Sequence, residues 1–409
     1  MVEVIQRRAR LAAAGCVIAL GASIAVSTAL DNILLVLLLV AWAASGLFVE
    51  TAKNALKNNY LKCAIALFAA LAVGVLYGVT PPREALGVLG KYADLLVIPV
   101  IAVVLRGTRA RNNALLAFAA SIALTVVLSW LLWLRLLPAW PVFVWDGVSP
   151  SVFKYKATHN ILVSFGVFLF AWLAVATEDR RARVAWAGFA VLAAGNVLFL
   201  VDGATGYMLL GALSVLWAAQ RLRGRQLRRV LLVAIAAAGL LIATPNPVRD
   251  RIGRIAGEAM SYEPGRAATG ENSTGVRLEF YRNTLPIIAG QPLTGVGTGG
   301  FARAYAQQVE GTAMAPAANP HNEFLGIMVQ LGAAGMILFL LLWWTQWRVA
   351  RELDTPLARG LMQGLVLAMV LGCAVNSLLL DHTEGLFYAW LSGVLLSGLQ
   401  YAPPAHAAS

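Results

Sequence analysis

Long apolar segments alternate with short polar ones along most of the chain. Most of the apolar segments run for about 17 to 22 residues, which is the length at which an α-helix crosses a hydrocarbon core of roughly 30 Å. The pattern therefore predicts an all-α polytopic membrane protein. We expect about twelve spans, at 11–29, 31–48, 62–79, 91–105, 113–135, 160–176, 184–201, 204–220, 229–244, 322–345, 361–380 and 383–400.

One long polar interval, after the ninth predicted span, interrupts this alternation. It divides the chain into nine spans, a large outer loop domain with amphipathic helices, three further spans and a short cytoplasmic tail. The corresponding ranges are 1–244, 245–321, 322–400 and 401–409.

Two stretches of the outer loop carry apolar residues at helical spacing. Ile252 and Ile255 lie on one side of 251–260, which predicts an interfacial amphipathic helix. A second helix is predicted over 276–290, with Arg277 at its start, where a helix N-terminus favours anions. The Gly-, Ser- and Pro-rich segment between them predicts irregular chain that serves as a linker or a lid.

Composition supports the membrane class and excludes a nucleic-acid-binding protein. Hydrophobic residues make up 59% of the 409 and charged residues 13%, whereas an ordinary soluble domain is roughly 25% charged. The formal net charge is +12, but the cations gather at alternate loops, such as Arg180, Arg181 and Arg183. By the positive-inside rule we expect both termini in the cytoplasm and the large loop on the outer face of the membrane.

Two outer segments are basic although the rule does not require it. One interpretation is a solvated surface on which arginines pair with neighbouring carboxylates. The other is a site for a diphosphate, because guanidinium groups match phosphate oxygens bidentately. The cations that could contribute are Lys154, Lys156, Arg266, Arg277 and Arg282, with His159 as a supporting residue.

No metal site is predicted, because the outer histidines occur singly and no H-x-x-H or D-x-D pair accompanies them. The sequence "GVGTGG" at 295–300 formally fits a dinucleotide-binding fingerprint, but it lacks the preceding strand that such a site needs. We interpret it as a tight turn that leads into a helix near Phe301.

The sequence "NPHNEF" stands at the outer boundary of the tenth predicted span. Asn319 and Pro320 are expected to start that helix. His321 is either a polar cap at the interface or a general base, for which its imidazole is suited near neutral pH. Asn322 and Glu323 point along different sides of the helix start, so at most one of them can orient the imidazole.

Two successive segments resemble the O-antigen ligase and polymerase superfamily. These are "TLPIIAGQPLTGVGTGGFARAY" and "NPHNEFLGIMVQLGAAGMILFLLLWW", and the resemblance covers about 276–345. It implies a membrane-embedded GT-C glycosyltransferase that uses glycans linked to undecaprenyl diphosphate, without metal or cofactor. It further implies that Arg277 binds the diphosphate and that His321 activates the acceptor.

The chain departs from the superfamily at one position. Many members have Ser-Arg-Gly where this sequence reads "DGATGYML", so that Thr205 stands in the place of the arginine. A second phosphate ligand must then come from elsewhere.

Within the superfamily the ligase fits best, because only "YAPPAHAAS" follows the last span, whereas protein O-oligosaccharyltransferases usually continue further. The expected partners are an undecaprenyl-diphosphate-linked O-antigen donor, a lipid A-core acceptor and membrane lipids. An O-antigen polymerase and a protein O-oligosaccharyltransferase are the alternatives in the same superfamily. A polytopic transporter is the alternative of another class, but the two halves of the chain show no repeat.

Overall fold

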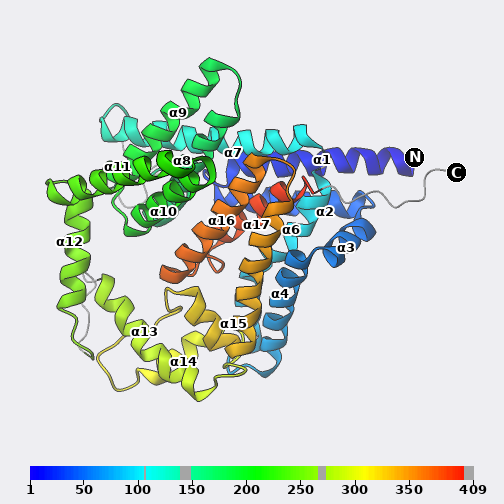
Figure 1. Cartoon of the computed structure of the whole chain (residues 1–409). Helices are drawn as coiled ribbons and strands as arrows, with labels where there is room; N and C mark the ends of the chain where they lie inside the picture. The colour runs from blue at the N-terminus through cyan, green and yellow to red at the C-terminus, as the bar shows by residue number, and fades with distance from the viewer. Residues whose placement is uncertain (106, 139–148, 266–272, 400–409) are drawn as a thin grey trace.

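The computed structural model describes residues 1–105, 107–138, 149–265 and 273–399, and these residues contain helices but no β-strand (Figure 1). The expectation of an all-helical protein is therefore confirmed for the described part of the chain. Arg266 and the predicted tail at 401–409 lie outside the described residues.

The first eleven α-helices cover the region of the nine predicted spans. Their bounds are α1 (Val2–Ser23), α2 (Thr28–Ala44), α3 (Phe48–Lys57), α4 (Asn59–Tyr77), α5 (Pro82–Lys91), α6 (Asp94–Val104), α7 (Thr108–Trp133), α8 (Lys156–Ala176), α9 (Arg180–Gly195), α10 (Ala204–Arg221) and α11 (Gly224–Ala243). A short π-helix, η1 (Asn196–Leu200), continues α9.

Six further α-helices complete the described chain. They are α12 (Pro247–Met260), α13 (Ser273–Gly290), α14 (Phe301–Gln308), α15 (Glu323–Val349), α16 (Pro356–Val375) and α17 (His382–Leu396), with a 3-10 turn, η2 (Ala350–Glu352), after α15. In Figure 1, α12, α13 and α14 form an arm that leaves the bundle after α11 and returns at α15.

Each of the twelve predicted spans overlaps a helix or a consecutive pair of helices. Eight of the described helical segments are long and apolar enough to cross a membrane, or up to nine if the bent pair α2 and α3 counts as one span. The chain bends by 103° between α2 and α3. The other predicted spans coincide with shorter or more polar helices, such as the 15-residue α17. Eight or nine spans is therefore what length and composition support in the described residues.

The helices predicted in the outer loop are confirmed. Asn246 caps α12 by accepting hydrogen bonds from the amides of Val248 and Arg249, and Pro247 occupies the first helical position, where no amide is needed. The expected place of Arg277 at a helix start is wrong, because α13 already begins at Ser273. Arg277 consequently lies in the second turn.

The two segments that carry the resemblance bind each other through their backbones. Gly332 interrupts α15 with a φ of 60° and a ψ of −154°, which removes regular helical hydrogen bonds around it. The amide of Val296 donates to Val329 O at 2.8 Å, and the amide of Ala333 donates to Pro292 O at 2.8 Å. The 292–297 turn thus satisfies backbone groups that the break exposes, as buried backbone groups require.

The "GVGTGG" turn is confirmed as a glycine turn before α14. Gly295, Gly297 and Gly299 all have positive φ, which glycine adopts without steric cost. A Cβ on Gly297 would collide with the backbone of Gly78 at the end of α4. The glycines therefore allow this turn to fit between α4 and α15.

Candidate active site

His321 lies in a tight turn immediately before α15. Its φ is 50°, in the left-handed region, and its backbone amide donates to Asn319 Oδ1 at 2.9 Å. The helix itself begins at Glu323, with Asn322 as the N-cap residue. The prediction that Asn319 and Pro320 start the helix is therefore wrong by a few residues, and Asn319 instead shapes the turn that presents the imidazole.

The imidazole of His321 is held by Asn376, which follows α16. His321 Nδ1 lies 3.1 Å from Asn376 Oδ1. Since a carboxamide oxygen can only accept, this contact requires the proton on Nδ1, and in a neutral imidazole the lone pair is then on Nε2. A neutral imidazole in this tautomer can take a proton from a hydroxyl group.

Asn322 and Glu323 do not contact the imidazole. The Asn322 side chain accepts from the amide of Leu325 at 3.1 Å and donates to Ala374 O at 2.9 Å. Glu323 is fully buried and accepts from the Tyr92 hydroxyl at 2.7 Å and from the amide of Leu379 at 3.1 Å. Both residues fix the start of α15 against its neighbours, so they support the turn rather than the ring.

Helix α13 packs against the His321 turn. The Phe280 ring stacks on the imidazole with a centroid distance of 5.9 Å and an interplanar angle of 19°. The Tyr281 hydroxyl donates to His321 O at 3.3 Å. Arg277 precedes Tyr281 by four residues, and residues four apart lie on the same side of a helix. One side of α13 therefore connects His321 with the surroundings of Arg277.

Arg277 opens into a cavity of about 380 Å³, which we call the arginine cavity. Its walls come from the start of α8, the η1–α10 connection, α12 and α13. The lining residues are Tyr155, Lys156, Ala157, Asn160, Asp202, Gly203, Ala204, Thr205, Gly206, Arg251 and Arg277.

Three cations and one carboxylate line the arginine cavity. Asp202 is engaged by arginines of α12, with Arg254 Nη2 at 2.7 Å from Oδ2 and Arg251 Nε at 4.0 Å from Oδ1. Arg251 Nε is buried and forms no hydrogen bond within the described part of the chain. No described residue makes a hydrogen bond or ion pair with Arg277 or Lys156. The cavity thus holds three cations whose donors are available to an anion.

The other predicted cations lie elsewhere. Lys154 is buried, 3.6 Å from Asp31 Oδ2, and its ammonium donates to the hydroxyls of Thr28 at 2.8 Å and Thr383 at 3.2 Å. Burial lowers the pKa of Lys154, while the Asp31 carboxylate acts in the opposite direction. This lysine is held as a structural ion pair, and it does not line the arginine cavity.

Arg282 faces the connection between α12 and α13 rather than the arginine cavity. Its Nη1 lies 3.2 Å from Glu279 Oε1. Burial raises the pKa of Glu279, but hydrogen bonds from Tyr262, Gly265 and Asn283 outweigh it, so that this pKa lies below its usual value. Glu279 is an anchor for the connection, and Arg282 is one of its partners.

His159 is a core residue. It is 1% exposed, its Nδ1 accepts from the amide of Val152 at 3.3 Å, and its Nε2 lies 2.9 Å from Asn196 Oδ1. These bonds tie the segment before α8 to η1. His159 can therefore support the arginine cavity only by fixing the start of α8.

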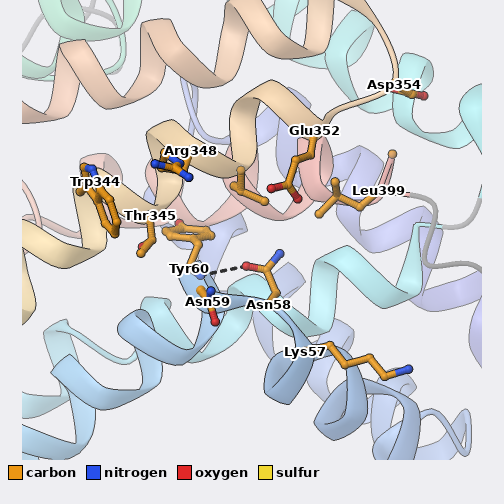
Figure 2. A pocket seen from close by; sticks show the side chains of 12 residues that line it. Lys57, Asn58, Asn59, Tyr60, Trp344, Thr345, Arg348, Glu352, Asp354 and Leu399 are labelled. Atoms are coloured by element: carbon orange, nitrogen blue, oxygen red, sulfur yellow. Dashed lines mark hydrogen bonds between the residues drawn. The ribbon is translucent and has the colours of Figure 1, made fainter.

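A larger cavity, of about 670 Å³, lies at the other end of α15 (Figure 2). We call it the Trp344 cavity. Figure 2 shows Trp344, Thr345, Arg348 and Glu352 along one wall and residues 57–60 along the other. α15 is broken at Gly332, and the helix from Ala333 to Trp344 alone corresponds to roughly 18 Å at about 1.5 Å per residue. The Trp344 cavity is thus remote from His321.

Residues 188–340 match the O-antigen ligase family. The match is consistent with the O-antigen ligase and polymerase superfamily and covers less than half of the chain. The match runs from α9 into α15, and it contains Asp202, Arg251, Arg277 and His321. The resemblance predicted for 276–345 is therefore confirmed as far as residue 340 and extends back to 188. The chain matches no curated protein.

No three His, Cys, Asp or Glu side chains converge to hold a metal ion among the described residues.

Sequence analysis missed two residues of this site. Arg251 belongs to the helix predicted over 251–260, and nothing in the local pattern distinguishes it from Arg249 or Arg254. Asn376 stands in "AVNSLLLD", far from His321 in sequence, and only the packing of α16 beside α15 brings it to the imidazole. An asparagine at the polar end of a predicted span was the only available signal.

Proposed function

We propose that the protein is an O-antigen ligase. It transfers O-antigen polysaccharide from undecaprenyl diphosphate to a sugar hydroxyl of lipid A-core at the periplasmic face of the bacterial inner membrane. The observation that carries the proposal is the double role of α13, which brings Arg277 to the arginine cavity and packs Phe280 and Tyr281 on the His321 turn. The family match supports the substrate class.

In this proposal the diphosphate of the donor occupies the arginine cavity. Arg277 and Arg251 offer forked donors, which suit adjacent phosphate oxygens, and Lys156 adds a third positive charge. Arg251 thereby supplies the cation that Thr205 does not. Because a guanidinium fork is fixed in shape, two of them also orient the diphosphate.

The transfer is a single displacement that inverts the anomeric carbon. His321 Nε2 removes the proton of the acceptor hydroxyl as its oxygen attacks that carbon. The bond from the carbon to the diphosphate oxygen breaks at the same time, and the diphosphate leaves with one more negative charge. The cations of the arginine cavity stabilise this charge as it develops.

The lipid anchor of the donor stays in the bilayer, so the cavity must be reached sideways between helices of a GT-C-type bundle with twelve spans and both termini in the cytoplasm. The reaction needs no metal, because fixed cations meet the phosphate charge. EDTA should therefore leave the initial transfer rate unchanged. A rate lost in EDTA and restored by Mg²⁺ or Mn²⁺ would contradict this.

Purified protein, a lipid-diphosphate-linked polysaccharide and lipid A-core provide the direct test. The ligase produces polysaccharide joined to lipid A-core, visible as a ladder on a gel. A polymerase instead lengthens lipid-linked repeat units without lipid A-core. In cells, deletion of a ligase leaves bare lipid A-core and accumulated lipid-linked polymer, whereas deletion of a polymerase leaves single repeat units on the core.

A further inference from the structure

Asn160 lines the arginine cavity, and its carbonyl oxygen has no hydrogen-bond partner among the described residues. The residue lies in the second turn of α8 and is fully buried. Its Nδ2 donates to Val201 O at 3.0 Å. Its Oδ1 accepts no hydrogen bond within the described part of the chain. A buried acceptor without a partner is unfavourable, because folding removes the water that would otherwise donate to it.

Two glycines of "DGATGYML" hold Asn160 in place. A Cβ on Gly203 would collide with Asn160 Nδ2, and a Cβ on Gly206 would stand 2.9 Å from the Asn160 Cβ. Both glycines therefore let the η1–α10 connection close directly on this side chain. Because Nδ2 is engaged by Val201 O, the amide orientation is fixed and Oδ1 remains as the free acceptor.

The groups on either side of a bound diphosphate limit which hydrogen-bond donors could reach Asn160 Oδ1. One side of the diphosphate continues into an isoprenoid chain, which has no hydrogen-bond donor. The other side continues into the first sugar, whose nearest donor is the substituent on C2, either a hydroxyl or an amide N–H. The cations that line the cavity are also hydrogen-bond donors, but they would donate to the bound diphosphate.

We propose that Asn160 Oδ1 accepts a hydrogen bond from the C2 substituent of the sugar that is linked directly to the diphosphate. Asn160 is then the residue that selects donors by their first sugar. This inference rests on the proposed binding of the donor diphosphate in the arginine cavity. A buried acceptor discriminates strongly against a ligand that lacks the matching donor, because the acceptor is then left without a partner.

The test compares binding of two short-chain polyprenyl diphosphate sugars to the full-length protein in detergent. One carries a 2-hydroxyl group and the other a 2-fluoro group, which has similar size but cannot donate a hydrogen bond. We expect the wild-type protein to bind the 2-hydroxy sugar roughly ten- to a hundredfold more tightly. Asn160→Leu, which keeps much of the volume but has no acceptor, should bind both sugars with similar affinity.

Ser164→Ala is the matched control. Ser164 lies one turn further along α8 and donates to Gly206 O at 3.2 Å, but it does not line the arginine cavity. It should keep the preference for the 2-hydroxy sugar. Equal binding of the two sugars by the wild-type protein overturns the inference, as does a preference that survives in Asn160→Leu.

A third ligand separates this inference from the proposed function. The polyprenyl diphosphate without a sugar should bind the wild-type protein and Asn160→Leu alike, and it should bind Arg277→Ala much more weakly. Failure of all three ligands to bind the wild-type protein overturns both proposals. Tight binding without discrimination between the sugars overturns only the role of Asn160.

Discussion

The Trp344 cavity encloses about 670 Å³ and the arginine cavity about 380 Å³, and of these two only the Trp344 cavity is lined by residues of α15. In the larger cavity Lys57 and Arg348 face Glu352, because Asp354, the other lining carboxylate, is already held by Arg111 at 2.7 Å. In the smaller one, Lys156, Arg251 and Arg277 face a single carboxylate.

The proposed anion site is thus distinguished from the Trp344 cavity by the sign and availability of its charges rather than by its size. A ligand with two phosphates needs cations that the protein does not neutralise itself. Asp202 is already bonded to Arg254, which lies outside the lining, so it does not cancel Arg277. The smaller cavity is also the one that α13 connects to a histidine with a free ring nitrogen.

The largest effect is expected at His321. His321→Ala should reduce kcat by about 10²–10⁴-fold, because removal of a general base typically has this cost. Donor binding should be retained, since the arginine cavity is intact. Transfer from a lipid-linked donor to lipid A-core by the purified variant measures the effect. Near-normal turnover would show that His321 only caps α15.

The second-largest effect on transfer is expected for Arg277→Lys. Lysine keeps the positive charge but loses the fork that holds two oxygens, so we expect a drop in kcat/KM of about 10²-fold. Arg282→Lys is the matched control, because Arg282 lies on the same helix but faces Glu279. Equal activity of Arg277→Lys and the wild-type enzyme would remove Arg277 from the site.

The sequence could point to candidate site residues whose type is tied to a reaction, but it could not show which residues pair with them or position them. His321 stands in one of the two segments that carry the resemblance, and Arg277 precedes the other by seven residues. The structure packs α13 on the His321 turn and places Arg277 of the same helix in the arginine cavity, while the roles of both residues stay predictions. Lys154 was also a predicted phosphate-binding cation, but it is buried against Asp31. Whether a cation is free or paired depends on a distant segment, and no local pattern contains that information.

The helices could be predicted from hydrophobic periodicity because each obeys a local rule. The break in α15 at Gly332 could not, because it depends on the 292–297 turn that supplies replacement hydrogen bonds. The contact between Asn376 and His321 is of the same kind. Such features arise when separate segments meet, so they appear only in the folded chain.

A smaller effect is expected at Asn376, which we regard as a positioning residue. Asn376→Ala removes the acceptor at His321 Nδ1, and a less defined ring orientation should lower kcat by about tenfold while KM stays similar. Asn376→Asp keeps an acceptor at the same place and should restore most of the rate. If both variants lose the same activity, the role of Asn376 is to hold the fold rather than the imidazole.

The smallest effect is expected in the Trp344 cavity. Arg348 lies over the Trp344 ring at 5.3 Å, so Arg348→Gln removes a cation–π contact worth about 0.5–1 kcal/mol of stability at an exposed site. Because this cavity lies near the far end of α15 from His321, kcat and KM for transfer should stay within about twofold of wild type. Glu352→Gln should behave alike, since it changes a carboxylate of the same cavity without altering side-chain volume. The measurement is a full kinetic comparison of both variants with Arg277→Lys in one preparation. If Arg348→Gln lost as much kcat/KM as Arg277→Lys, the larger cavity would have to hold part of the donor, and the distinction between the two cavities would fail.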